Sequence, residues 1–386
     1  MSVDHPGVPL WEPPNVRGRG RIPERASTVI VGGGLTGVAL LRELPDAVLL
    51  ERASLAAGAS GRNAGFLLAG VASNYAAAAG QYGRSLTGEI WAFTSENRER
   101  LAEALGGTAE LRRRGSWTVA ASAPEADQLR ASEELLHEDG FEGEWLQHPA
   151  GLEPFHGALL NPRDAELNPS LAVGELARPC LDRVVEGAQV TALEVGAGRV
   201  RVVLESGEHV VAENVVVATN AHITQLLPEL PVTPMRAQMA ATVPTNVPMA
   251  FRPAYGDHGY QYWRQRADGR VLVGGYRKLA LEAEETAVET PTAEIQAHLD
   301  AHLRLLGAGG LQITHRWAGI MGFTPDGLPL VGAVPGASGV FVCGGYTGHG
   351  FGFAAECARR LAAQITGGPP APSWLDPGRF SAIPAA

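Results

Sequence analysis

Residues 28–37 read TVIVGGGLTG, and this stretch decides the fold class. The β-branched run before the glycines predicts a buried strand, and the residues after them predict a helix. The glycines fit the pattern G-x-G-x-x-G: Gly32 permits the tight turn, Gly34 lets a pyrophosphate approach the backbone, and Gly37 lets helix and strand pack closely. The first N–H groups of the helix would then face the phosphates. The stretch therefore predicts a dinucleotide-binding βαβ unit.

The residues after the glycines complete this unit. A helix is expected over residues 35–44 and a second strand over residues 47–50. Glu51 stands 19 residues after Gly32, where an acid is expected to bind a ribose hydroxyl. A glycine-rich turn without a ligand is the alternative, and the strand, the helix and the placed acid together disfavour it.

The composition excludes several classes of protein. Of 386 residues, 45% are hydrophobic and 19% are charged, which is ordinary for a globular protein of two to three domains. The net charge of −10 argues against nucleic acid or an anionic membrane as the main partner. The polar residues 1–25 contain no apolar signal segment, and no run of about 18 apolar residues is present to span a membrane. We expect a soluble protein.

Three cysteines are spread widely along the chain, at Cys180, Cys343 and Cys357. This sparse, odd set makes neither a disulfide framework nor a zinc site. A reducing compartment, the cytoplasm, is therefore expected, and no metal site.

Three later segments favour FAD over NAD as the dinucleotide. Residues 57–65 read AGASGRNAG, residues 214–221 read NVVVATNA, and residues 344–352 read GGYTGHGFG between an apolar run and a helix. Small residues let the backbone run beside a ligand. Free N–H groups of the last segment would stabilise negative charge on a reduced flavin.

Together these segments resemble the D-amino-acid-oxidase-like superfamily of FAD oxidoreductases, most closely its γ-glutamylputrescine-oxidase-like and glycine-oxidase-like branch. The resemblance covers residues 10 to 365 and implies FAD bound non-covalently by a flavoprotein oxidoreductase. Besides the fingerprint, it is carried by Leu10-Trp11, residues 60–63 (SGRN), 218–221 (ATNA), 227–230 (LPEL), 270–275 (RVLVGG), 317–319 (WAG), 324–332 (TPDGLPLVG) and 348–350 (GHG).

The residues expected to bind FAD lie in these glycine-rich and strand-end segments. They are Gly32, Gly34, Leu35, Thr36, Gly37, Glu51, Arg52, Ser60, Gly61, Arg62, Asn63, Ala64, Gly65, Val190, Ala218, Thr219, Asn220, Gly344, Gly345, Tyr346, Gly348, His349, Gly350 and Phe351.

The expected fold is α/β with α+β insertions: a discontinuous, Rossmann-like FAD-binding domain interrupted twice by an antiparallel-sheet substrate domain. Similar apolar strands at residues 27–31, 47–50, 214–218 and 339–343 indicate the discontinuity. The expected FAD-binding parts are residues 1–80, 160–222 and 316–370, the substrate parts are 81–159 and 223–315, and 371–386 is a loose tail. Helices are expected at 89–105, 124–137, 292–306 and 353–365, and further strands at 115–120, 190–195, 200–204, 235–243 and 259–275.

The resemblance also shows what this chain lacks. In the α-amino-acid oxidases of the superfamily, an arginine near the position of Gly319 holds the substrate carboxylate with a planar fork. Here Met321 stands in that place. A plain α-amino acid held in that way is therefore disfavoured, and Arg62, Arg264 or Arg277 would have to replace the missing arginine.

Two further features of sarcosine-oxidase-like members are missing. Their flavin-linking cysteine lies near the position of Gly319, where this chain has none. Their oxygen-activating lysine falls on a strand position that Leu272 or a neighbour occupies here, and Lys278 lies several residues away. Non-covalent FAD is therefore expected, and the electron acceptor is either O₂ or another molecule.

The catalytic candidates are His349, Tyr262, Arg264 and Arg62. Tyr260, Tyr262 and Trp263 alternate on a predicted strand, so one of its faces would line the substrate cavity, although ordinary sheet packing explains the pattern equally well. The expected reaction is oxidation of a C–N bond of an amine or amino acid by hydride transfer to flavin N5, followed by imine hydrolysis.

Three alternatives stay open. The first is an FAD-dependent hydroxy-acid dehydrogenase on the same fold, and the second is a flavoprotein subunit with little activity of its own. The third is an NAD(P)-dependent reductase, which would purify colourless. The exact substrate and the oligomeric state do not follow from the sequence.

Overall fold

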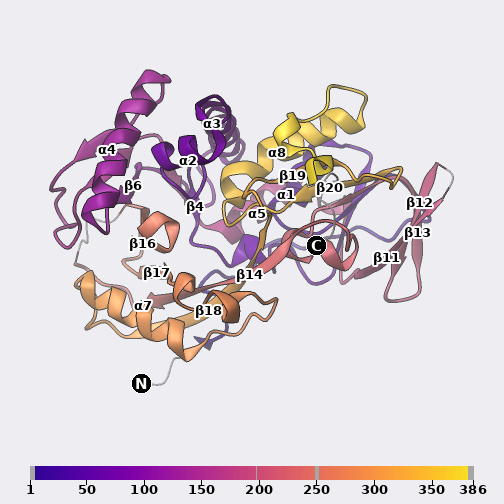
Figure 1. The fold of residues 1–386 in the computed structure, drawn as a ribbon. Coiled ribbons are helices and arrows are strands. Elements are labelled where there is room, and N and C mark those ends of the chain that lie inside the picture. Colours follow the sequence, from indigo (N-terminus) through magenta and orange to yellow (C-terminus); the bar gives the residue numbers. More distant parts are fainter. Residues whose placement is uncertain (1–4, 197, 248–251, 381–386) are drawn as a thin grey trace.

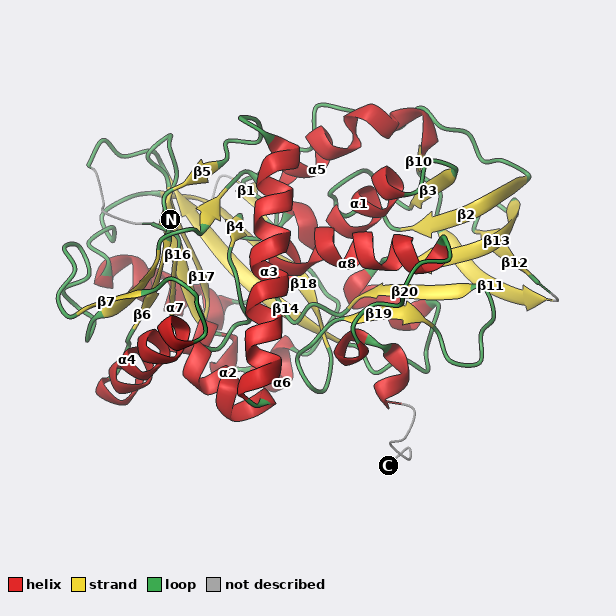
Figure 2. Cartoon of the chain, turned by 90° about the horizontal axis from the view of Figure 1, so that it is seen from above, coloured by secondary structure: helices red, strands yellow, loops and turns green. Residues whose placement is uncertain are grey.

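The computed structural model describes residues 5–196, 198–247 and 252–380. These residues form two large sheets and one small sheet (Figure 1). Seen from above, the two large sheets lie toward opposite ends of the molecule, with helices between them (Figure 2). The predicted mixed α/β class is confirmed.

The first large sheet contains the predicted βαβ unit. Residues Thr28 to Val31 pair in parallel with residues Ala47 to Leu50, as the glycine pattern requires. In spatial order, the parallel strands are β10 (Val184–Glu186), β3 (Ala47–Glu51), β2 (Arg25–Val31), β13 (His209–Val217) and β20 (Val340–Gly344). Three antiparallel strands extend this sheet. Strand β12 (Arg199–Leu204) pairs with the first half of β13, and β11 (Val190–Gly196) pairs with β12. Strand β19 (Leu330–Ala333) pairs with β20.

Both faces of this sheet are covered, which explains why its strands are apolar runs without alternation. On β2, Ile30 packs into the core formed with the helices, while Val29 and Val31 pack into a second core on the opposite face. The covering helices are α1 (Leu35–Glu43), α5 (Pro169–Ala177) and α8 (Gly350–Ile365).

The second large sheet carries two long antiparallel strands, β14 (Thr233–Thr242) and β18 (Ile313–Phe323), in register from Thr233 opposite Phe323 to Ala241 opposite His315. In spatial order, the sheet is β1 (His5–Pro6), β18, β14, β17 (Val271–Gly275), β16 (Gln261–Gln265), β15 (Ala254–Gly256), β6 (Ser116–Val119), β8 (Ala158–Asn161) and β7 (Glu144–Leu146). Helix α7 (Ala293–Leu305) packs on β14 and β17.

Four further α-helices complete the described part of the chain. Helix α3 (Arg84–Leu105) packs against α8 and crosses the centre of the molecule in Figure 2. The others are α2 (Tyr75–Tyr82), α4 (Ala123–Glu138) and α6 (Leu281–Glu284), and the small sheet is β4 (Phe66–Leu67), β9 (Ala165–Glu166) and β5 (Arg112–Arg113). Among the described residues, no helix has the length and apolarity needed to cross a bilayer.

Several predicted domain boundaries fall inside elements. The boundary at 315/316 cuts β18, which belongs to the second sheet, so the return to the first sheet comes only after Phe323. The boundary at 159/160 cuts β8, the one at 80/81 cuts α2, and the one at 222/223 cuts the short helix η3 (Asn220–Gln225). Each of these elements continues across the predicted boundary, so the local sequence pattern does not mark the boundary.

The predicted loose tail is wrong for its described part, which ends at residue 380. Two short turns at Ser373–Leu375 and Pro377–Phe380 pack on the first sheet, and Leu375 is fully buried. The Arg379 guanidinium pairs with Asp326 at 2.8 Å and donates to the Leu328 carbonyl at 2.7 Å. Residues 381–386 lie outside the described part of the chain.

Candidate active site

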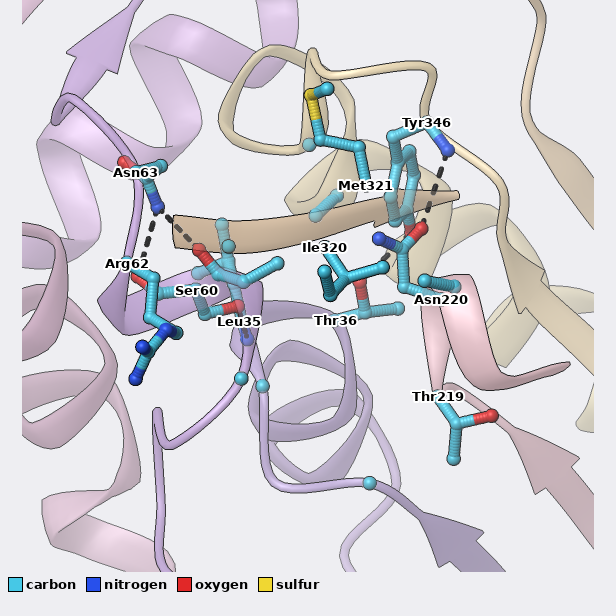
Figure 3. A pocket seen from close by; sticks show the side chains of 18 of the residues that line it. Leu35, Thr36, Ser60, Arg62, Asn63, Thr219, Asn220, Ile320, Met321 and Tyr346 are labelled. Atoms are coloured by element: carbon cyan, nitrogen blue, oxygen red, sulfur yellow. Dashed lines mark hydrogen bonds between the residues drawn. The ribbon is translucent and has the colours of Figure 1, made fainter. Parts of the chain in front are cut away.

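One cavity of about 420 Å³ runs from the glycine fingerprint (residues 32–37) to the inner face of the second sheet. It is lined by parts of all four segments that the sequence singled out: the fingerprint, residues 57–64, residues 218–221 and residues 346–352. The structure therefore brings the predicted FAD segments together around one space, as the close-up in Figure 3 shows.

At the fingerprint end, the backbone of Gly32, Gly33 and Gly34 lines the cavity; this lining is called the glycine cradle below. Gly32 has φ +116°, a conformation that favours glycine. A Cβ on Gly34 would lie 3.0 Å from the Ser60 hydroxyl, on the side that faces the cavity. The Leu35 N–H, at the start of α1, donates to Ser60 Oγ at 2.9 Å. The N-terminus of α1 and its dipole thus face the place expected for a pyrophosphate, with Ser60 beside it on the cavity wall.

Glu51 lies where the sequence predicted it, at the end of β3 and on the cavity wall. Its carboxylate accepts hydrogen bonds from the Gly33 N–H at 2.6 Å and the Ala53 N–H at 2.8 Å. These bonds fix the carboxylate in place and also hold the fingerprint loop against β3. Each carboxylate oxygen keeps a lone pair that a ribose hydroxyl can use.

Five of the predicted FAD-binding glycines do not line the cavity: Gly37, Gly61, Gly65, Gly344 and Gly345. Each instead allows close packing behind the wall. A Cβ on Gly37 would overlap the Gly32 carbonyl oxygen, and one on Gly61 would overlap the Ala56 carbonyl oxygen. These glycines shape the site without touching its contents, a distinction that a sequence pattern does not make.

The other predicted FAD-binding residues lie on the cavity wall. They are Gly32, Gly34, Leu35, Thr36, Glu51, Arg52, Ser60, Arg62, Asn63, Ala64, Val190, Ala218, Thr219, Asn220, Tyr346, Gly348, His349, Gly350 and Phe351.

Asn220 joins the end of β13 to the glycine turn (residues 344–352). It adopts the left-handed conformation with φ +47°, and its Oδ1 accepts from the Gly345 N–H at 3.0 Å and the Tyr346 N–H at 3.4 Å (Figure 3). The Tyr346 hydroxyl shares a 2.9 Å hydrogen bond with Thr36 Oγ1 in α1. The turn is therefore tied to both β13 and the fingerprint helix.

The opposite end of the cavity is a mostly apolar space, here called the aromatic chamber: Phe66, Tyr255, Tyr262, Met321 and His349. Tyr262 points into it from β16, whereas Trp263, the next residue, stacks on Phe155 in the core of the other face. The alternation that the sequence indicated is therefore real. Tyr255 stacks on His349 with ring centroids 5.7 Å apart.

Burial keeps the titratable groups of the chamber neutral. Burial lowers the pKa of His349 to about 4, and the positive charge of Arg277 contributes in the same direction. Burial also raises the pKa of Tyr262 to about 12 and the pKa of Tyr255 above its ordinary value. The chamber therefore presents a neutral imidazole and two protonated phenols at physiological pH.

The pH dependence of flavin reduction should follow from this. Because His349 gains a proton only near pH 4, replacing it in His349→Gln should not change the shape of the rate profile between about pH 5.5 and 9. Any rise of the rate with pH should come from deprotonation of the substrate amine. Stopped-flow reduction of the bound flavin across this range checks the point. A wild-type limb near pH 6 to 7 that disappears in His349→Gln would contradict it.

The arginines differ sharply in their surroundings. Arg264, a predicted catalytic residue, does not line the cavity: it is 2% exposed, donates to the Gly65 and Leu167 carbonyls at 3.1 and 2.9 Å, and pairs with Glu166. This corrects the expectation that its guanidinium reaches a substrate. Its bonds instead hold the backbone that follows residues 57–64, a role invisible in the strand pattern.

Arg62 does line the cavity, yet its guanidinium is occupied. It donates to the Ala318 carbonyl at 2.6 Å and to the Gly7 carbonyl at 3.1 Å, and it pairs with Glu289 at 3.6 Å. Its own carbonyl accepts from Trp317 Nε1 at 2.8 Å. Arg62 therefore connects residues 57–64 to β18.

Several residues of the cavity wall carry no signal in the sequence. Tyr255 lies on a short strand with no hydrophobic period, Phe66 lies on a two-residue strand, and Glu289 lies in a loop. Only their position in the folded chain brings them to the cavity. Arg277 also lies on the wall, and it is one of the three arginines that the sequence offered for a substrate carboxylate.

The residues of the cavity wall fit FAD. Among the described residues, no group of three or more His, Cys, Asp or Glu side chains is placed to hold a metal ion. The glycine cradle, the fixed acid at the end of β3 and the glycine turn at the N-terminus of α8 meet the needs of a pyrophosphate, a ribose and a flavin ring in that order.

Comparison with known proteins agrees with this fit. The sequence pattern of the family described as "FAD dependent oxidoreductase" (DAO) matches residues 27–364. The chain is 26% identical to "4-methylaminobutanoate oxidase (formaldehyde-forming)" of Paenarthrobacter nicotinovorans, over 93% of this chain and 46% of that protein. It is also 26% identical to the "Probable oxidoreductase OrdL" of Rhizobium meliloti (strain 1021), over 89% of this chain and 83% of the relative. The chain thus spans less than half the length of the first of these relatives.

Solved structures show the same fold. Glycine oxidase from Geobacillus kaustophilus superposes with a TM-score of 0.77 at 21% identity, covering 92% of this chain and 98% of the other. L-proline dehydrogenase from P. horikoshii superposes with a TM-score of 0.75 at 20% identity, covering 93% and 99%.

Proposed function

Since the chain belongs to the DAO family of FAD-dependent oxidoreductases, we propose that it oxidises a C–N bond of an amine or amino acid. The observation that carries the proposal is the single cavity that joins the glycine cradle to the aromatic chamber. It would place a substrate beside the glycine turn, under Tyr255 and Tyr262 from the second sheet.

Bound FAD supplies the acceptor for a hydride taken from the carbon next to nitrogen. The fingerprint would hold its pyrophosphate, Glu51 a ribose, and the glycine turn its flavin ring. Helix α8 begins at Gly350, within the glycine turn, so its dipole would stabilise negative charge there.

The chamber favours a neutral amine over an ammonium ion. Phe66 and Met321 are apolar, and the Tyr262 phenol is protonated and neutral. The positive charge of Arg277 also acts on this space, where it lowers the pKa of His349. A positive charge beside the chamber disfavours a second one within it. The neutral imidazole of His349 can accept a hydrogen bond from an amine N–H and so orient the lone pair of the nitrogen.

The substrate class we propose is an amine without an α-carboxylate, or with its carboxylate far from the reacting carbon. Met321 packs toward the glycine turn: a Cβ on Gly348 would lie 3.2 Å from its sulfur. A carboxylate next to the reacting carbon would meet this thioether, which donates no hydrogen bond. The named substrate of the Paenarthrobacter relative, 4-methylaminobutanoate, has a distant carboxylate and supports this class.

The flavin is proposed to be non-covalent. All three cysteines are buried and free, and none lies on the described cavity wall. Acid precipitation of the yellow protein should therefore release the flavin into the supernatant, measured by its absorbance. Flavin that stays with the pellet would contradict the proposal.

The acceptor that reoxidises the flavin is proposed to be O₂ or another small molecule. Lys278 pairs with Asp257 and lies outside the cavity wall, so it is not placed to assist O₂. A reducing, cytoplasmic location is proposed on the three free cysteines, whose unpaired state fits such a compartment.

The proposed function is tested by anaerobic addition of amines to the purified holoprotein. Loss of the oxidised flavin absorbance with at least one class of amine is expected. Flavin that light reduces but no amine reduces would contradict an enzyme of this type and favour a subunit with little activity alone.

A further inference from the structure

Arg277 differs from the other arginines near the cavity. It lines the cavity and is half-buried, yet within the described part of the chain its guanidinium has neither an ion pair nor a hydrogen bond. Arg62 and Arg264 are occupied by carbonyl oxygens and carboxylates, and Arg52, at the other end of the cavity, contacts His222 at 3.3 Å. Arg277 therefore has its hydrogen-bond donors available.

Two aromatic rings hold the guanidinium in position. Its central carbon lies 4.4 Å from the Tyr260 ring centroid and 5.1 Å from the Phe323 ring centroid. Contacts of this kind engage the positive charge of the group and not its N–H donors, so the donors stay available to an oxygen acceptor. Phe323 follows Met321 by two residues on β18, so both side chains lie on the same face of the strand.

The backbone that carries Arg277 is also fixed. Tyr276 adopts the left-handed conformation with φ +66°, and its N–H donates to the Tyr260 carbonyl at 2.6 Å. Its hydroxyl shares a 2.8 Å hydrogen bond with His302 Nδ1 in α7, and its ring stacks on His298. The arginine is thus preorganised, which lowers the entropy lost on binding a ligand.

The charges around the chamber favour an anion near Arg277. Its positive charge acts on His349, Tyr255 and Tyr262, the three titratable groups of the aromatic chamber. The two carboxylates on the described wall are satisfied elsewhere: Glu51 by backbone N–H groups at the fingerprint, and Glu289 by Arg62.

We propose that Arg277 binds the carboxylate of the substrate, and that this carboxylate is separated by several bonds from the carbon that is oxidised. The inference rests on the proposed function, because it assigns the polar end of the same substrate. Arg277 is half-buried on the cavity wall, whereas Tyr262 is buried, and His349 lies within the glycine turn where the flavin ring is expected. The acid end of the substrate therefore lies at Arg277 and the amine end in the aromatic chamber.

The first experiment compares two amines that differ only in the acid. We expect Arg277→Met to raise the apparent Kd of 4-(methylamino)butanoate in anaerobic flavin reduction by about 30- to 100-fold, the effect of losing a charge-assisted pair. The apparent Kd of N-methylbutylamine should stay within about threefold of wild type, and Arg277→Lys should fall between wild type and Arg277→Met for the acid. The matched control is Lys278→Met, which removes the neighbouring cation outside the cavity wall and should leave both amines unchanged.

Equal effects of Arg277→Met on both amines, or no effect on either, would overturn the inference. A second measurement separates this failure from failure of the proposed function. Butanoate, which has no C–N bond, should perturb the absorbance of oxidised flavin in the wild type and bind about 30- to 100-fold more weakly to Arg277→Met. Undiminished binding of butanoate to the variant would overturn the inference whether or not any amine is oxidised. Flavin that no amine reduces, with butanoate binding still dependent on Arg277, would overturn the proposed oxidation alone.

Discussion

Gly34→Val is expected to yield a protein that folds but purifies without flavin. A Cβ on Gly34 would already lie 3.0 Å from the Ser60 hydroxyl, which accepts the hydrogen bond of the Leu35 N–H. The two methyl groups of valine would extend into the space in front of the helix start, where the pyrophosphate is expected. The ratio of flavin absorbance to protein absorbance should fall to near zero. Full flavin content would show that the fingerprint is not the cofactor site.

The matched control for this change is Gly80→Val. Gly80 lies exposed in α2 with no heavy atom within 4 Å of an added Cβ, and it should keep its flavin. A circular dichroism spectrum of Gly34→Val that matches wild type should show that the loss of flavin is not caused by misfolding. Glu51→Ala should retain part of the flavin, because one ribose contact contributes about 1.5–3 kcal/mol. Part of the flavin loss in Glu51→Ala should come from the fingerprint loop, which loses the hydrogen bond from the Gly33 N–H to the carboxylate.

Glycine, sarcosine and D-alanine are expected to reduce the flavin at least about a hundredfold less efficiently than amines with a distant carboxylate. A bidentate, charge-assisted pair in a dry pocket contributes about 3 kcal/mol to transition-state binding, and Met321 offers none of it to an α-carboxylate. The measurement is stopped-flow flavin reduction with a series of ω-(methylamino)alkanoates of increasing chain length, and sarcosine is its shortest member. Efficiency should rise with the chain length until the carboxylate reaches Arg277.

Fast reduction by glycine or D-alanine, with none by longer amines, would contradict this expectation. It would mean that Arg277, whose ring contact Phe323 lies close to Met321 on β18, serves an α-carboxylate in place of the arginine missing at position 321. The chain would then be an ordinary amino-acid oxidase in substrate choice.

The nucleotide-binding half of the fold could be predicted from local sequence. Residues 28–51 contain a strand, a glycine turn, a helix and a second strand in immediate succession, and each is specified by nearby residues. The parallel pairing of β13 and β20 could also be inferred, because apolar runs covered on both faces have few other places in a fold. The short helix α2 was not predicted. Gly83 is both the C-cap of α2 and the N-cap of α3, so only one residue separates the two helices.

Only the part of the site that a local sequence motif specifies could be predicted. Glycines and the acid at Glu51 follow from the needs of a phosphate and a ribose, so their positions could be named. Arg264 lies in β16 and Arg277 follows the end of β17 by two residues, and nothing in the local sequence distinguishes their roles. They differ in the partners that the fold gives them. Arg264 is bonded to Gly65 and Leu167 on a distant segment, and no local pattern encodes that contact.

The account is tested most directly by product analysis of one anaerobic turnover. The holoprotein is mixed with excess 4-(methylamino)butanoate without oxygen, the lost flavin absorbance is measured, and the released amine and carbonyl products are quantified. The account predicts one amine and one carbonyl product for each flavin reduced. Flavin that is reduced by 2-hydroxy acids and by no amine, with a keto acid and no nitrogen compound released, would contradict it.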